Sequence, residues 1–125
     1  MPKRRDKLSL ERAEESLPLR PIAFAVLSSL AQGPRAGFEI LEFVQQTHPA
    51  TGLLGPGTLY RLLRELRRDR LIERTDAPGG AGGADDERRT YSVLTPWGEA
   101  VMLAEAARLR RTFRAAGLPD LLSEA

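Results

Sequence analysis

Apolar residues recur at helical spacing over the first half of the chain. From residue 22 to 31 nearly every position is apolar, which predicts a buried helix. Gly33-Pro34 follows this stretch and is typical of a helix end. Over about 36–47 the apolar positions recur every three or four residues, which predicts a second helix with one buried face.

The third predicted helix, about residues 58–69, has two chemically different faces. Thr58 follows the turn Gly55-Pro56-Gly57 and is the predicted N-cap. The apolar face consists of Leu59, Leu62, Leu63 and Leu66, and a separate face carries Arg61, Arg64 and Arg68, with Arg67 beside them. This one short helix therefore has leucines to bury and arginines to present.

Two short strands and a long helix complete the pattern. The strands, at about 71–75 and 88–94, flank a glycine-rich tip at 77–84, and together they predict a β-hairpin. Thr95-Pro96 then opens the last helix, with threonine at the N-cap. This helix ends near 117–119, and its apolar stripe consists of Met102, Ala106, Leu109 and Phe113.

The order of these elements predicts a fold that is mainly α with a small β-hairpin (α+β). Three helices followed by a hairpin is the winged helix-turn-helix arrangement, in which the third helix enters the major groove of DNA. We expect a basic N-terminal arm or helix at 1–17, the DNA-binding domain at 18–94, and a dimerisation helix and tail at 95–125. A second copy of the chain is the expected partner of the long helix, because its apolar stripe must be buried on something.

The composition excludes several classes of function and favours a polyanion as the partner. The formal net charge of the 125 residues is only +2, but the positive charge is almost all arginine, whose planar head suits phosphates and base edges. Because the chain has no cysteine and only one histidine, disulfides, thiolate nucleophiles, histidine-based triads and multi-histidine metal sites are excluded. The longest apolar stretch is too short to cross a bilayer. We therefore expect a cytoplasmic protein without catalytic residues, cofactor or metal.

Residues 20–110 resemble the PadR family of transcriptional regulators at two places. Residues 55–63, followed by Leu71-Ile72-Glu73, are similar to the family's Gly-Thr-Leu-Tyr recognition helix and the start of its wing. Residues 86–91, followed by 94–98, are similar to its arginine-rich second wing strand and its Leu-Thr-x-x-Gly entry to the dimerisation helix. The resemblance implies a DNA-binding homodimer, usually a repressor. Some family members sense small aromatic molecules, which leaves a small-molecule effector open.

Two positions depart from the family pattern. Arg70 stands where the family usually has a glycine that ends the recognition helix in a left-handed turn, so the helix ends differently or Arg70 carries mild strain. Ser92 stands where many members have a second tyrosine after the one that matches Tyr91. No role of that second ring can be carried over to this chain.

The expected DNA contacts lie on two elements. The N-terminal half of a recognition helix meets base edges, which favours Thr58, Tyr60, Arg61 and Arg64. Arg68 is a further candidate, but it also fits a solvated helix end that favours cations. In the wing, Arg88 and Arg89 would contact phosphate or the minor groove, unless they pair with the acidic residues at 85–87.

Two alternatives to sequence-specific binding of double-stranded DNA stay open. The domain could be a winged-helix protein-interaction module with little or no DNA binding. A single-stranded nucleic-acid binder is disfavoured, because it would need surface aromatics for stacking and only 6% of the residues are aromatic.

The basic arm at 3–7 fits a phosphate-binding tail and a disordered segment equally well.

Overall fold

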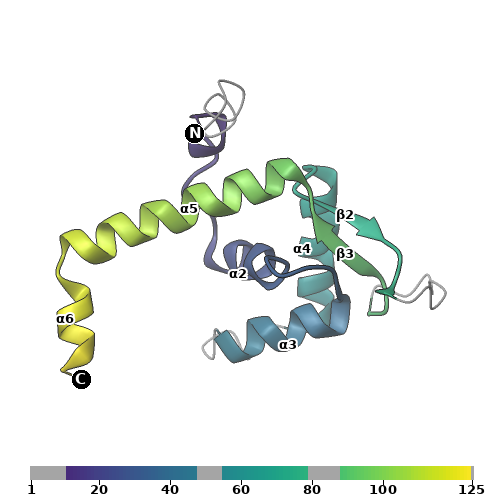
Figure 1. Cartoon of the computed structure of the whole chain (residues 1–125). Coiled ribbons are helices and arrows are strands. Elements are labelled where there is room, and N and C mark those ends of the chain that lie inside the picture. The colour runs from purple at the N-terminus through teal and green to yellow at the C-terminus, as the bar shows by residue number, and fades with distance from the viewer. Residues whose placement is uncertain (1–10, 48–54, 79–87, 125) are drawn as a thin grey trace.

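The computed structural model describes residues 11–47, 55–78 and 88–124. Of the expected N-terminal arm, residues 11–14 are helical and 15–17 are not, and residues 1–10 lie outside the described residues. The elements that follow are α2 (Pro21–Ser29), β1 (Arg35–Ala36), α3 (Gly37–Thr47), α4 (Pro56–Arg68), β2 (Ile72–Thr75), β3 (Tyr91–Leu94), α5 (Pro96–Ala115) and α6 (Leu118–Ser123). Figure 1 shows α2, α3 and α4 grouped beside the small sheet, while α5 crosses the group and extends beyond it.

The predicted fold class is confirmed, with one strand more than the sequence indicated. The sheet is antiparallel and has the order β1-β3-β2, so β3 is paired on both sides. The added strand is Arg35–Ala36. The pairing continues beyond it, because the amides of Gly37 and Phe38 donate hydrogen bonds to the carbonyls of Thr90 and Arg88, just before β3. A two-residue strand is too short for alternating polarity to reveal it. It anchors the start of α3 to the wing.

One continuous core lies between the helices and the sheet. The four leucines of α4 that the sequence assigned to a buried face are all buried there. They meet apolar side chains of α2 and α3, with Ile72 of β2 and Met102 of α5 closing the core. The amphipathic pattern of α4 therefore determines which side of this helix faces the domain and which side faces outward.

The recognition-type helix α4 begins earlier than the sequence suggested. Its N-cap is Gly55, which makes no side-chain cap hydrogen bond, and Pro56 occupies the first helical position. The prediction of Thr58 as N-cap is therefore wrong. Proline at the first position already has a helical φ and needs no amide partner, so it starts the helix.

The C-terminal end of α4 adopts the left-handed turn that the family usually builds with glycine. Arg70 has a φ of 62°. Its amide donates to the carbonyl of Arg67 at 3.0 Å, and the amide of Leu71 donates to the carbonyl of Leu66 at 2.9 Å. Of the two outcomes that the sequence left open, the structure shows the strained one, with an L-residue in a conformation that favours glycine.

Replacing Arg70 with glycine is expected to stabilise the fold by about 0.5–1 kcal/mol, because glycine adopts a positive φ without a steric penalty. Urea unfolding followed by circular dichroism measures the effect. Arg68→Gly, in the last turn of the same helix, is the matched control and is expected to destabilise by about 1 kcal/mol. Equal destabilisation by both substitutions would show that Arg70 carries no backbone strain.

Thr95 joins the end of α4 to the start of α5. Its hydroxyl accepts from the amide of Gly98 at 2.9 Å, which confirms the predicted N-cap. The same hydroxyl lies 2.6 Å from the carbonyl of Arg70, and the amide of Thr95 donates to the carbonyl of Leu71 at 3.1 Å. The turn that ends α4 is therefore fixed directly to the first turn of α5.

Ser92, at the second departure from the family pattern, is a core position of β3. It is 1% exposed, and its hydroxyl has no hydrogen-bond partner among the described residues. The strand therefore buries a small side chain at this point, and Tyr91 and Val93 on either side of it are only partly buried.

Candidate nucleic-acid interface

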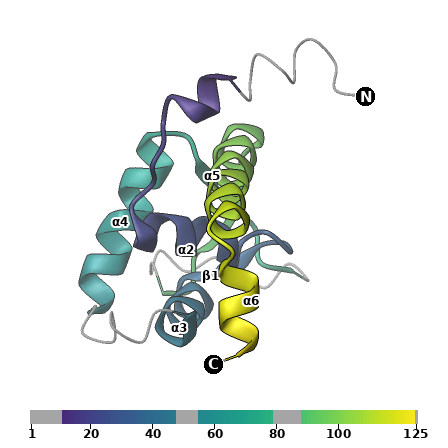
Figure 2. The same ribbon diagram turned by 90° about the vertical axis from the view of Figure 1, so that its left-hand side faces the viewer.

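The arginine face of α4, defined here as Arg61, Arg64 and Arg68, lies on the side of the helix away from the buried leucines. Arg61 and Arg64 are exposed and make no hydrogen bond or ion pair with any described residue. Figure 2 shows α4 along one side of the molecule, where no other described helix covers its outer surface. Two free guanidinium groups on an open helix surface can each form paired hydrogen bonds to phosphate or to a guanine edge.

The other residues predicted on this helix differ in their availability. Thr58 is exposed in the first turn, and Tyr60 is half-buried and packs against the core. Arg68 is exposed and lies 3.4 Å from the carboxylate of the neighbouring Asp69. Because both side chains of this pair are mostly exposed, the interaction is weak and leaves Arg68 available to a stronger anion.

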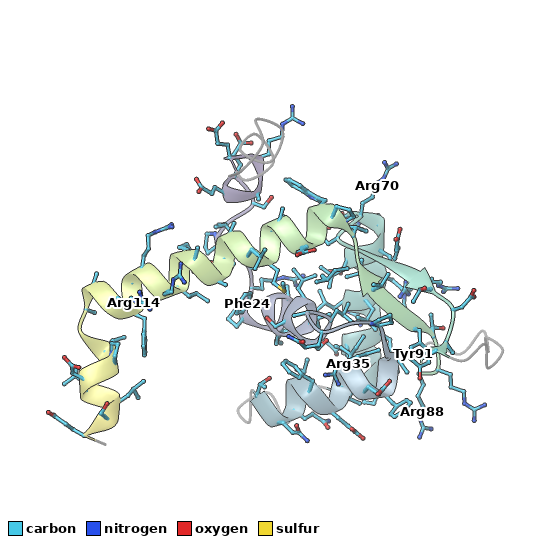
Figure 3. All side chains as sticks on the ribbon, in the orientation of Figure 1. Phe24, Arg35, Arg70, Arg88, Tyr91 and Arg114 are labelled. Carbon is cyan, nitrogen blue, oxygen red and sulfur yellow. The ribbon has the colours of Figure 1, made fainter. Side chains whose placement is uncertain are left out.

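The wing carries two further arginines at its base. Arg88 and Arg89 are exposed in a turn immediately before β3. Figure 3 shows Arg88 at the end of the sheet near the wing, pointing away from the domain. The carbonyl of Arg88 accepts a hydrogen bond of 3.0 Å from the amide of Phe38, which fixes the backbone at this point. The acidic residues at 85–87, which the sequence offered as alternative partners of these arginines, lie outside the described residues.

Arg20 lies next to this helix and was not singled out from the sequence. Its guanidinium pairs with the carboxylate of Glu65 at 3.3 Å, so the start of α2 is tied to the middle of α4. The 45-residue separation of the two partners explains why no local sequence pattern indicated the contact. Because both side chains of this pair are also largely exposed, the interaction is weak, and Arg61 has no carboxylate partner among the described residues.

The apolar stripe of α5 divides into a buried part and an outward part. Met102, predicted for the dimer interface, is only 7% exposed and belongs to the core of its own chain, so the prediction is corrected for this residue. The first turns of α5 pack against the domain core, so the apolar stripe is buried within the chain at that end of the helix. Ala106 and Phe113 are half-buried, and Leu109 is 42% exposed.

A second apolar surface follows α5 and was missed from the sequence. The short helix α6 begins after Gly117, which has a φ of 70°, and Figure 1 shows it turned away from the axis of α5. Leu121 and Leu122 are 59% and 62% exposed, and Leu118 is also exposed. Their spacing of three and four residues was a signal that could have predicted this helix.

The described residues show no candidate metal site, because they contain no group of three or more side chains that could hold a metal ion. Among them, too, no helix has the length and apolarity needed to span a membrane. What the site offers is a set of exposed cations on a helix and on the wing beside it, and this arrangement can bind a polyanion.

A helical core, a projecting amphipathic helix and an antiparallel wing define a winged helix-turn-helix protein. The model of the Transcriptional regulator PadR-like family matches residues 26–104, which is more than half of the chain. The chain belongs to this family of transcriptional regulators and is not an enzyme. The resemblance seen in the sequence is thus confirmed. A search of curated protein sequences finds no match.

Solved structures show the same fold. A PadR-like transcriptional regulator from Bacillus cereus is 20% identical, with a TM-score of 0.55 over 80% of this chain and 89% of that chain. A MarR family regulator from Neisseria meningitidis is 27% identical, with a TM-score of 0.52 over 85% of this chain and 75% of that one. The transcriptional repressor CouR, bound to a 23-mer DNA duplex, is 22% identical, with a TM-score of 0.56 over 96% of this chain and 81% of that chain.

Proposed function

We propose that this chain is a sequence-specific regulator that binds double-stranded DNA as a homodimer and represses transcription. The observation that carries the proposal is the pair of exposed, unpartnered guanidinium groups of Arg61 and Arg64 on α4. Arginine paired to guanine is the commonest specific contact in the major groove. A repressor of similar fold bound to a DNA duplex supports the same use of the fold here. The proposed site of action is the cytoplasm.

The wing is proposed to contact the backbone on either side of the groove that α4 enters. Arg88 and Arg89 lie at the end of a sheet whose middle strand is paired on both sides, so their backbone is held in place. Phosphate contacts of this kind position a protein on DNA without reading its sequence. Residues 18–94 would then form the DNA-binding unit, and 95–125 the dimerisation helix and tail.

Selection from a random duplex library, followed by fluorescence anisotropy, tests the proposal. The account predicts enrichment of a two-fold symmetric sequence whose half-sites are about one helical turn, roughly 34–36 Å, apart. A protein-interaction module would enrich no sequence and would bind all duplexes equally weakly. That result would overturn the proposed function.

The dimer is proposed to form through the outward part of the α5 stripe, Ala106, Leu109 and Phe113, with the exposed leucines of α6 beside it. Replacing Leu109 with glutamate is expected to weaken the dimer on the order of a hundredfold, because each subunit would bury an unpaired carboxylate at a two-fold interface. Sedimentation at several concentrations measures the dimer constant. Ala115→Glu, at an exposed position on another side of α5, is the control and is expected to leave the dimer unchanged. An equally stable dimer in the Leu109→Glu variant would exclude this interface.

A further inference from the structure

The junction between α4 and α5 connects the helix proposed to read DNA with the helix proposed to form the dimer. Figure 1 shows the first turn of α5 beside the end of α4, with the rest of α5 extending away from the domain. Figure 3 places Arg70 at this corner of the molecule. Among the described residues buried in the core around α4, Met102 is the one that α5 contributes. Beyond this packing, the contacts at the corner join the end of α4 directly to α5.

One side chain, Thr95, makes both polar contacts of this junction. Its hydroxyl donates to the carbonyl of Arg70 at 2.6 Å, and the carbonyl of Leu71 lies 3.1 Å from the same oxygen. That oxygen also accepts a hydrogen bond from the amide of Gly98 at 2.9 Å. A hydroxyl can donate and accept at the same time, whereas an ionised carboxylate can only accept. The proton of Thr95 therefore joins α5 to the end of α4, while its oxygen caps α5.

The backbone at this corner is closely packed as well. A Cβ atom at Gly98 would lie 1.8 Å from the carbonyl oxygen of Leu71, so α5 meets the chain that follows α4 without an intervening side chain. Arg70, with a φ of 62°, turns the chain so that its carbonyl reaches the hydroxyl of Thr95. A junction made of backbone and one short side chain has little freedom to bend, because it contains no long side chain whose rotation could absorb the movement.

A small bend at this junction would be large at the dimer interface. Leu109 is the fourteenth residue after Thr95, which places it about 21 Å along a helix that rises about 1.5 Å per residue. A bend of about 10° would therefore displace Leu109 by about 3–4 Å. That displacement equals about one base-pair step, since about ten base pairs span roughly 34 Å of DNA.

We propose that Thr95 is a positioning residue that fixes the separation between the two half-sites that the dimer accepts. This inference rests on the proposed function, because it requires α4 to read DNA and α5 to form the two-fold dimer. The hydroxyl acts through α4, by holding the arginine face of each subunit at one angle to the dimer helix. Loss of the donated hydrogen bond then relaxes the half-site spacing and leaves the contacts within one half-site unchanged.

Substitutions of Thr95 separate the junction from the N-cap. Thr95→Ser keeps both hydrogen bonds. Thr95→Asp keeps an N-cap acceptor but has no proton to donate at neutral pH, and Thr95→Ala has neither. Thr47→Ala is the matched control, because the hydroxyl of this exposed threonine donates to the carbonyl of Phe43 in its own helix. If Thr95 only capped α5, the aspartate variant would behave like the wild type.

Electron paramagnetic resonance without DNA tests the junction on its own. The chain has no cysteine, so Arg68→Cys on α4 and Ala115→Cys on α5 provide two specific sites for spin labels. An excess of unlabelled protein restricts the measured distance to one subunit. We expect a narrow distance distribution with Thr95, Thr95→Ser and Thr47→Ala, and a distribution broader by about 3–4 Å with Thr95→Asp and Thr95→Ala. Equal widths for Thr95→Asp and the unsubstituted chain would overturn the proposal.

Fluorescence anisotropy on duplexes of altered spacing relates the junction to DNA. The selected duplex is compared with versions that have one base pair more or less at the centre, and with a duplex that keeps one half-site. We expect the wild type and Thr95→Ser to lose about tenfold or more in affinity on each altered spacing. Thr95→Asp should lose less than about threefold there and bind the single half-site within about twofold of the wild type. A wild-type spacing preference in Thr95→Asp would overturn the proposal.

The two failures are separable. If the distance distribution of Thr95→Asp broadens but no duplex is bound, the proposed function fails and the role of Thr95 in holding α4 against α5 stands. If the selected duplex is bound but Thr95→Asp keeps the wild-type distribution and spacing preference, the positioning role fails and the proposed function stands.

Discussion

Replacing Gly98 with alanine is expected to destabilise the fold by about 3 kcal/mol. A Cβ atom at this position would lie 1.8 Å from the carbonyl oxygen of Leu71, which is backbone and cannot rotate away. The same carbonyl accepts a hydrogen bond from the amide of Thr95, so a shift of this carbonyl would also disturb the junction between α4 and α5. Glycine is therefore required here for close approach, since the residue is helical and needs no positive φ.

Urea unfolding followed by far-ultraviolet circular dichroism measures this loss. Gly57→Ala is the control, because a Cβ at Gly57 meets no atom within 4 Å. Alanine in the first turn of α4 is expected to be neutral or to stabilise by up to about 1 kcal/mol. Similar unfolding midpoints for the two variants would show that the contact between Gly98 and Leu71 does not constrain the fold.

Replacing Glu105 with leucine is expected to destabilise the fold by about 2 kcal/mol. Glu105 is 1% exposed on α5, and its carboxylate accepts a 2.6 Å hydrogen bond from the amide of Leu19. It also accepts a hydrogen bond from the guanidinium of Arg108. Leucine would fill the space but would leave a partly buried amide without an acceptor, and this loss is the main cost. Glu105→Gln keeps an acceptor oxygen and is expected to cost less.

The same carboxylate predicts a dependence of stability on pH. Burial raises the pKa of Glu105, but the hydrogen bonds from Arg108 and Leu19 and the charge of Arg108 outweigh this effect and hold the pKa below its ordinary value of 4.5. The carboxylate therefore stabilises the fold above pH 4.5, and this contribution is lost as the pH falls through the lower pKa of the folded state. Urea midpoints of wild type and Glu105→Gln, measured from neutral pH down to pH about 3, should converge at the acidic end. A constant difference over that range would contradict a charged Glu105.

The features that the sequence predicts correctly are those that repeat locally. Leu59, Leu62, Leu63 and Leu66 fall on one side of a 3.6-residue period, so their burial and the outward position of Arg61 and Arg64 follow from spacing alone. The N-cap at Thr95 is a local pattern as well, because its acceptor and donor are three residues apart. These elements give the class of fold and the candidate site.

The features that the sequence does not predict depend on contacts between distant segments. β1 is defined by pairing with β3, more than fifty residues away, and has no pattern of its own. The helical spacing of apolar residues from Met102 to Phe113 predicts a single dimer stripe, but the first turns of α5 pack against the core of their own chain and bury Met102 there. The pair of Arg20 with Glu65 joins the start of α2 to α4, which are far apart in the chain.

The central claim is that α4 reads bases. Its most direct test compares the affinity of the Arg61→Ala variant for the selected duplex with its affinity for a random duplex. Arg89→Ala is the counterpart on the wing. If α4 reads bases, Arg61→Ala loses about tenfold or more in affinity for the selected duplex and much less for the random one. Arg89→Ala then weakens both alike and lowers the slope of log affinity against log salt by about one. Equal losses on the two duplexes from Arg61→Ala would contradict a base-reading role for the arginine face of α4.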